Sequence, residues 1–239
     1  MIQVSVFVVA LAAYAQTGGP TFEVATVKPA SAEEIAAGGS GIPTRHGRAT
    51  GINVTLKRCI IGAYHIGPGQ VVGGPGWMDV DRFHIEAKAE SDIFDDSVMD
   101  AMMRNLLAER FHLVVHRETR EMRALVLGLA KGGAKLEKGE GNDAVTNAGH
   151  GRIRLKNSTM DAFAERLSRA TEWPVLNETG IEGVFNLKLE WTPEGNHPNL
   201  DGTPDLMTAI REQLGLQLKL KKAPVSVLVV DHAEKPGEN

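Results

Sequence analysis

The stretch "HGRATGINVTL" at residues 46–56 returns in altered form as "HGRIRLKNSTM" at residues 150–160. Each stretch ends where apolar residues begin to recur at i, i+3, i+4 and i+7, the period of one helical face. The first set is Leu56, Cys59, Ile60 and Ala63, and the second is Met160, Phe163, Ala164 and Leu167. Thr55 and Thr159 stand just before the two sets, where a hydroxyl accepts a hydrogen bond from a free first-turn amide. The chain is therefore predicted to contain an internal duplication with a helix in each copy.

The same elements follow both helices in the same order. "RFHIEAKA" at 82–89 and "VFNLKLEW" at 184–191 alternate apolar and polar residues, which predicts two strands with one packed face each. A second helix is predicted in each half, around 99–107 and 206–214, the later one starting at Thr203 and Pro204 and ending at Gly215. The alternating segments at 111–130 and 215–232 are each predicted to form a hairpin.

These patterns predict an α+β fold of two tandem related β-α-β-β-α-β-β repeats, with helices packed on small sheets. The first repeat covers residues 22–130 and carries an extra N-terminal strand, "FEVATVKP". A Gly-rich linker follows at 131–151, and the second repeat covers 152–239.

The N-terminus is typical of an export signal over residues 1–15. The apolar run at 4–13 is followed by Ala13-Tyr14-Ala15, a small-residue cleavage pattern. The run is too short for a bilayer, which needs about 20 residues, so no membrane span is expected after cleavage. No Lys or Arg precedes the run, and a buried N-terminal strand is the alternative interpretation. We expect an exported protein, periplasmic or extracellular.

Charge and cysteine content exclude some classes of function. The 26 basic and 30 acidic side chains give a net charge of −4, which argues against a nucleic-acid partner. Cys59 is the single cysteine and lies on the apolar stripe of its helix. It is predicted to be a small buried hydrophobic residue rather than a nucleophile.

A resemblance to a known family rests on several stretches in order. These are "FEVATVKPA", "VVGGPGWMDVDRFHIEAKA", "LLAERFHLVVHRETRE", "VLNETGIEGVFNLKLEW" and the C-terminal "APVSVLVVDHAEKPGEN". From Phe22 to Asn239 the chain resembles an uncharacterised family of exported proteins of soil bacteria. The resemblance implies no catalytic residues. Some members of the family are attached to membrane sensor-peptidases, which implies a role in envelope signalling. Each half is also similar to the short N-terminal module of secretins and TonB-dependent receptors, which implies docking of other proteins.

Candidate site residues gather around three histidines. His112 and His116 are four residues apart, and His84 lies two residues before Glu86. In a strand, residues four apart stand about 13 Å from each other, too far for one zinc ion. We therefore predict no metal site, no cofactor and no catalytic residue.

Trp77 follows the glycine-rich "GGPG" turn at 73–76. It is either a surface anchor for a partner or a plug at the end of the fold.

The function predicted from the sequence is a non-catalytic module that binds a protein or peptide of the cell envelope. Trp77, His84 and Glu86 are its candidate binding residues, and sheet edges or the groove between repeats are its candidate surfaces. The alternative is an envelope hydrolase or metal-dependent enzyme built on the polar face with His84, Glu86, His112 and His116. A structural or stress-related envelope protein without a defined ligand is the third possibility.

Overall fold

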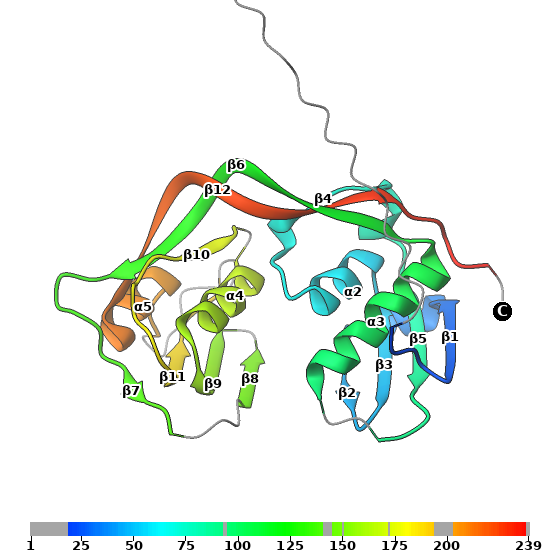
Figure 1. The fold of residues 1–239 in the computed structure, drawn as a ribbon, viewed down its shortest axis with the longest axis horizontal. Coiled ribbons are helices and arrows are strands. Elements are labelled where there is room, and N and C mark those ends of the chain that lie inside the picture. Colours follow the sequence, from blue (N-terminus) through cyan, green and yellow to red (C-terminus); the bar gives the residue numbers. More distant parts are fainter. Residues whose placement is uncertain are drawn as a thin grey trace, which may run out of the picture.

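The structure is a computed structural model that describes residues 19–92, 95–140, 145–149, 151–171, 173–193 and 203–237. The predicted signal segment, residues 1–15, lies outside the described residues. Two lobes lie on the same side of one long pair of strands, which runs across the top of the view (Figure 1). The first half of the chain forms most of lobe 1, and the second half forms most of lobe 2.

Strands in the described residues form three four-stranded sheets. The sheet of lobe 1 has the order β1 (Val24–Pro29), β5 (Phe83–Lys88), β3 (Arg48–Val54) and β2 (Thr44–Arg45). The sheet of lobe 2 has the order β7 (Glu137–Lys138), β11 (Phe185–Glu190), β9 (Arg152–Ser158) and β8 (Val145–Gly149). The shared upper sheet has the order β10 (Val175–Asn177), β6 (Val114–Leu129), β12 (Leu216–His232) and β4 (Val71–Gly73).

The described residues contain five α-helices. They are α1 (Ala32–Ala37), α2 (Leu56–Ala63), α3 (Asp96–Phe111), α4 (Met160–Ala170) and α5 (Leu206–Leu214), with the short 3-10 turns η1 (Pro68–Gln70) and η2 (Gly76–Asp79). As predicted, the side chains of Thr55 and Thr159 cap α2 and α4. The predicted start of α5 was wrong, because Asp205 is the N-cap and accepts from the Thr208 amide. Gly215 ends α5 in the left-handed region, and a Cβ there would stand 2.1 Å from the Gly133 carbonyl oxygen.

The two predicted hairpins do not form. β6 and β12 are each one continuous strand of 16 and 17 residues, and they pair antiparallel with each other from Leu216↔Leu129 to His232↔Val114. We call this pair the ribbon. The alternating charges of "HRETRE" at 116–121 are typical of an exposed hairpin turn, but they lie in the first half of the continuous strand β6. Alternation within a strand does not reveal which distant strand is its partner, so the sequence pattern did not exclude the ribbon.

The ribbon makes each lobe depend on both halves of the chain. Leu228 and Val230 of β12 belong to the core of lobe 1, although the rest of that core comes from residues 27–113. Leu125 and Leu127 of β6 belong to the core of lobe 2, with residues 153–216. Two short parallel strands also join the ribbon. β4 of lobe 1 pairs with β12, and β10 of lobe 2 pairs with β6.

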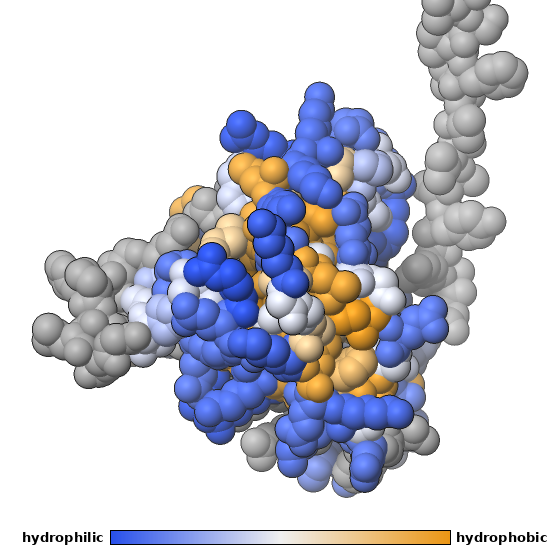
Figure 2. Space-filling model, turned by 90° about the vertical axis from the view of Figure 1, so that its left-hand side faces the viewer, coloured by the Kyte–Doolittle hydropathy of each residue, from blue (hydrophilic) through white to orange (hydrophobic). Residues whose placement is uncertain are grey.

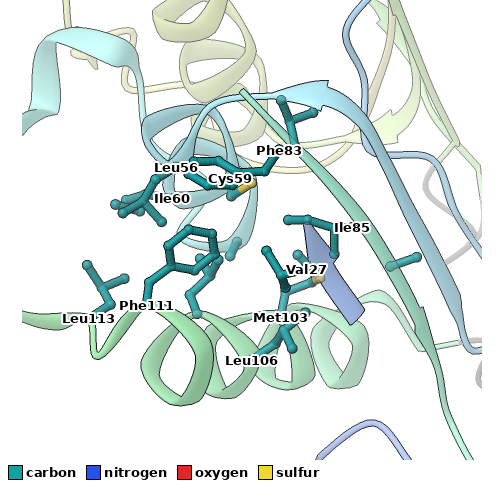
Figure 3. Close-up of a cluster of buried hydrophobic side chains, with 14 of the residues drawn as sticks. Val27, Leu56, Cys59, Ile60, Phe83, Ile85, Met103, Leu106, Phe111 and Leu113 are labelled. Atoms are coloured by element: carbon teal, nitrogen blue, oxygen red, sulfur yellow. The ribbon is translucent and has the colours of Figure 1, made fainter. Parts of the chain in front are cut away.

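The core of lobe 1 forms where helices face the sheet. Leu106 and Phe111 of α3 lie toward Ile85 of β5, and Leu56 and Ile60 of α2 close the same cluster (Figure 3). These side chains are at most 4% exposed. Their burial removes apolar surface from water at about 25 cal/mol per Å², which is the main stabilising contribution to the lobe.

A third, small apolar cluster joins the lobes under the middle of the ribbon. Ala124, Val225 and Val227 are fully buried there, and Val72 of β4 and Leu176 of β10 pack against them. The junction therefore takes one short strand from each lobe and both strands of the ribbon.

The fold class is α+β, as predicted. The order β3-α2-β4-β5-α3-β6 in the first half parallels β9-α4-β10-β11-α5-β12 in the second. Descent from one copied unit stays a prediction, and so do the domain boundaries. The segment predicted as a linker, 131–151, contributes β7 and β8 to the sheet of lobe 2.

Candidate binding surface

Trp77 lies in η2 and packs on the core of lobe 1. Its ring centroid is 6.4 Å from that of Phe111 and 6.2 Å from that of Phe83, and the Lys235 ammonium lies 6.0 Å above it. The indole is partly buried and packs against the core cluster of lobe 1. The geometry fits the plug interpretation, and a role as partner anchor stays a prediction.

The structure brings His84 and Glu86 together on β5. The His84 Nε2 atom is 3.3 Å from a carboxylate oxygen of Glu86, and Nδ1 is 3.4 Å from one of Glu34 on α1. The side chain of Glu86 is 67% exposed, so this is a solvated contact of small energetic weight.

His112 and His116 each contact an acid near the C-terminus instead of each other. His112 Nδ1 lies 3.2 Å from Glu234, and His116 Nδ1 lies 2.7 Å from Asp231, a hydrogen bond that raises the pKa of His116. Among the described residues, no hydrogen bond or ion pair joins either histidine to His84. No group of three or more His, Cys, Asp or Glu in this part of the chain is arranged to hold a metal ion. The four residues of the alternative enzyme site thus form separate pairs.

Cys59 is buried in the core of lobe 1, as predicted. Burial raises the pKa of its thiol to about 12. The thiolate needed for nucleophilic chemistry is therefore negligible at neutral pH.

An ion cluster at the junction of the lobes was missed by sequence reasoning. His65, just after α2, contacts Asp100 of α3 through Nε2 and Glu165 of α4 through Nδ1, the latter at 3.2 Å. Arg169 of α4 reaches Glu165 and lies 2.7 Å from His65 Nδ1. The two carboxylates raise the pKa of His65 to about 9. Nε2 donates to Asp100 and Nδ1 lies between Glu165 and Arg169, so the cluster links α4 of lobe 2 to α3 of lobe 1.

Close packing next to this cluster holds the two lobes at a short distance. A Cβ on Gly67 would stand 2.6 Å from the Ser168 carbonyl oxygen of α4. The sequence contains only a weak signal for the His65 cluster, because His65 and Glu165 are far apart in the chain and neither belongs to a motif.

We expect the His65 cluster to make stability fall at alkaline pH. The raised pKa means that the contribution is complete below the unfolded value of about 6.5 and is lost as pH rises through about 9. The His65 side chain is 39% exposed, so solvent screening reduces the expected loss to about 1 kcal/mol. Urea unfolding at about pH 7 and pH 10 measures it, and Asp100→Asn should remove most of the difference. An unchanged difference in that variant would contradict this role for His65.

The middle of the ribbon presents a basic face to solvent. Successive side chains of a strand point to opposite faces, and the register is continuous from Leu216 to Val230. Lys222 is therefore on the same face as Leu216 and Leu228, which are buried in the two lobe cores. Lys222 itself is exposed, because the ribbon twists between the lobes and its other face covers the junction cluster.

Like charges stand opposite each other on this face. Arg123 of β6 and Lys222 of β12 are cross-strand partners, both exposed, and neither has a carboxylate within 4.0 Å among the described residues. Such pairs destabilise a sheet by a few tenths of a kcal/mol. Arg48↔Lys88, between two inner strands of the lobe 1 sheet, is a like-charge pair of the same kind. The like-charge pair Arg154↔Lys188 in lobe 2 differs, because both side chains contact Glu190.

The edge of β12 beside these charges has open backbone groups. Leu125 donates its N–H to Pro174 on the far side of β6, so its partner Leu220 directs its own N–H and C=O away from β6. By alternation Leu218 and Lys222 do the same. Within the described ranges, no backbone hydrogen bond occupies this edge, since β4 pairs only with Leu228–Val230.

Apolar and cationic side chains meet at that edge. An open depression of about 450 Å³ is lined by Arg123, Leu220, Lys221 and Lys222. The Leu220 side chain is 48% exposed, and Lys221 holds Glu178 at 3.2 Å. Seen from the side of lobe 2, apolar surface runs between projecting hydrophilic side chains (Figure 2). The signal for this surface in the sequence is "LKLKK" at 218–222, where leucines alternate with lysines.

The fold and this surface define an α+β protein of two lobes under a shared ribbon with a partly open, basic edge. Residues 57–233 match the family described as "Protein of unknown function (DUF3738)", and the chain belongs to that family. Comparisons with curated proteins and with solved structures each found no match. No helix in the described part of the chain is both long and apolar enough to cross a bilayer.

The family match confirms the resemblance to an uncharacterised family. The association with soil bacteria and the likeness of each half to the modules of secretins and TonB-dependent receptors stay predictions.

Proposed function

We propose that the protein is an exported, non-catalytic module of the cell envelope that binds an extended peptide segment of a partner protein at the open edge of β12. The observation that carries the proposal is the unoccupied backbone of Leu218, Leu220 and Lys222 in a strand held firmly on its other side by β6. Strand addition uses such N–H and C=O groups for affinity and the adjacent side chains for specificity.

The rest of the β12 edge limits the length of the binding site. Pro224 provides no N–H at the next outward position, and the Gln70 side chain donates to the Ser226 carbonyl at 3.0 Å. Prolines and lysines on an edge strand reduce indiscriminate pairing between chains. The open part is therefore limited to Leu218–Lys222 and the residues just before it. The apolar run at 4–13 and the cleavage pattern at 13–15 support the proposed export.

Strand addition is testable with three labelled heptapeptides: Thr-Glu-Thr-Val-Glu-Val-Thr and its versions with Gln or Lys in place of both Glu. We expect at least one to bind and to slow amide exchange of Leu218, Leu220 and Lys222 by about tenfold or more, because a bound strand protects these groups. Fluorescence polarisation measures binding, and hydrogen exchange locates it.

Two variants at one position separate backbone from side-chain recognition. Leu220→Pro removes an outward N–H without removing a bond to β6, and is expected to abolish protection of the edge. Leu220→Ala keeps the N–H and should retain protection of the edge, with a reduced affinity for the peptide. Failure of all three peptides to bind with protection of this edge would refute the proposed function.

A further inference from the structure

The cationic side chains beside the open edge define what kind of strand fits it. Lys219 and Lys222 are exposed on opposite faces of β12, and Arg123 lies across the ribbon from Lys222. Within the described part of the chain, no ion pair is formed by any of the three, in contrast to Lys221, which holds Glu178. The whole chain has a net charge of −4, so this excess of positive charge is local.

The apolar positions alternate with these charges. Leu218 is partly buried against the core of lobe 2, and Leu220 is half exposed on the same face as Lys222. A strand added antiparallel to β12 places one residue opposite each of these positions. Opposite Lys222 and Lys219 a carboxylate would be stabilised, and opposite Leu220 and Leu218 an apolar side chain would bury surface.

We propose that the partner segment is acidic and alternating, with the order acid, any residue, apolar, acid, apolar opposite Lys222 through Leu218. This inference rests on the proposed function and deepens it. The like-charge pair Arg123↔Lys222 is a local destabilisation, and a carboxylate on the added strand offsets it by pairing with Lys222 from the side away from Arg123. Basic and purely apolar strands are disfavoured at the same edge, which gives specificity by repulsion as well as attraction.

The test compares affinities of the three heptapeptides for the full chain. The Glu peptide should bind about tenfold more tightly than the Gln peptide, and the Lys peptide should bind more weakly than either. Raising salt from about 50 mM to about 500 mM should remove most of the preference, because exposed charges are screened. Equal affinities for the Glu and Gln peptides, with the β12 edge protected by both, would overturn the acidic preference and leave strand addition intact.

Charge variants locate the preference. Lys219→Gln with Lys222→Gln should lower affinity for the Glu peptide about tenfold and leave that for the Gln peptide unchanged. Arg48→Gln with Lys88→Gln is the matched control, because it removes the same charge from a like-charge site inside the sheet of lobe 1. Lys219→Glu with Lys222→Glu should reverse the preference toward the Lys peptide. A preference that persists in the reversed variant, or falls equally in the control, would show that these lysines do not select the partner.

Discussion

Residues 22–130 expressed alone are expected to show no cooperative unfolding transition, and residues 131–239 alone are expected to behave the same way. Each fragment lacks a ribbon strand that contributes to its core. The first loses Leu228 and Val230, which are 1% and 3% exposed, and the second loses Leu125 and Leu127. A buried Leu or Val contributes about 1.5–3 kcal/mol, and the pairing of the long strands is lost as well. These losses are comparable to the total stability of a typical domain, about 5–15 kcal/mol.

Mixing the two fragments provides the positive control. Because β6 and β12 come from different fragments, the mixture should form a 1:1 complex with the circular dichroism spectrum of the full chain and a cooperative transition. Analytical ultracentrifugation and thermal unfolding measure both. If residues 22–130 alone unfold near the midpoint of the full chain, lobe 1 is an independently stable domain that does not require β12.

Local features of this fold were predictable from local pattern. The i, i+3, i+4, i+7 stripe after Thr55 and its counterpart after Thr159 identified α2 and α4 together with their caps. Alternation identified β5 and β11, because one face of each packs against a core. Both patterns depend only on residues that are close together in the sequence.

The ribbon and the features built on it were not predictable in that way. Alternation in 114–129 and 216–232 is equally compatible with a hairpin in each half and with pairing between halves, since it does not identify the partner strand. The charged stretch at 116–121 is typical of a turn, although it belongs to the continuous strand β6. His65 meets Glu165, and Arg123 meets Lys222, only because that long-range pairing brings the halves together.

Phe111→Ala is expected to lower the free energy of unfolding by about 3–5 kcal/mol, the usual cost of a large aromatic truncation in a core. The Phe111 side chain is fully buried, and its ring centroid lies 5.1 Å from that of Phe83 in an edge-on contact. Its backbone carbonyl also accepts from the Glu234 amide at 2.7 Å, just beyond the end of β12. The cavity left by the ring adjoins Trp77, so tryptophan fluorescence should report the change along with chemical denaturation.

Phe163→Ala is the matched variant in lobe 2, because Phe163 on α4 is also fully buried. We expect a loss of similar size and, in both variants, one transition with the same midpoint by fluorescence and by circular dichroism. The reason is that Leu228 couples the core of lobe 1, and Leu127 that of lobe 2, to the same pair of strands, so neither lobe can open without exposing part of the ribbon. Two separated transitions in Phe111→Ala, with the later one unshifted from the full chain, would show that lobe 2 retains its structure after lobe 1 unfolds. The ribbon would then connect the lobes without coupling them.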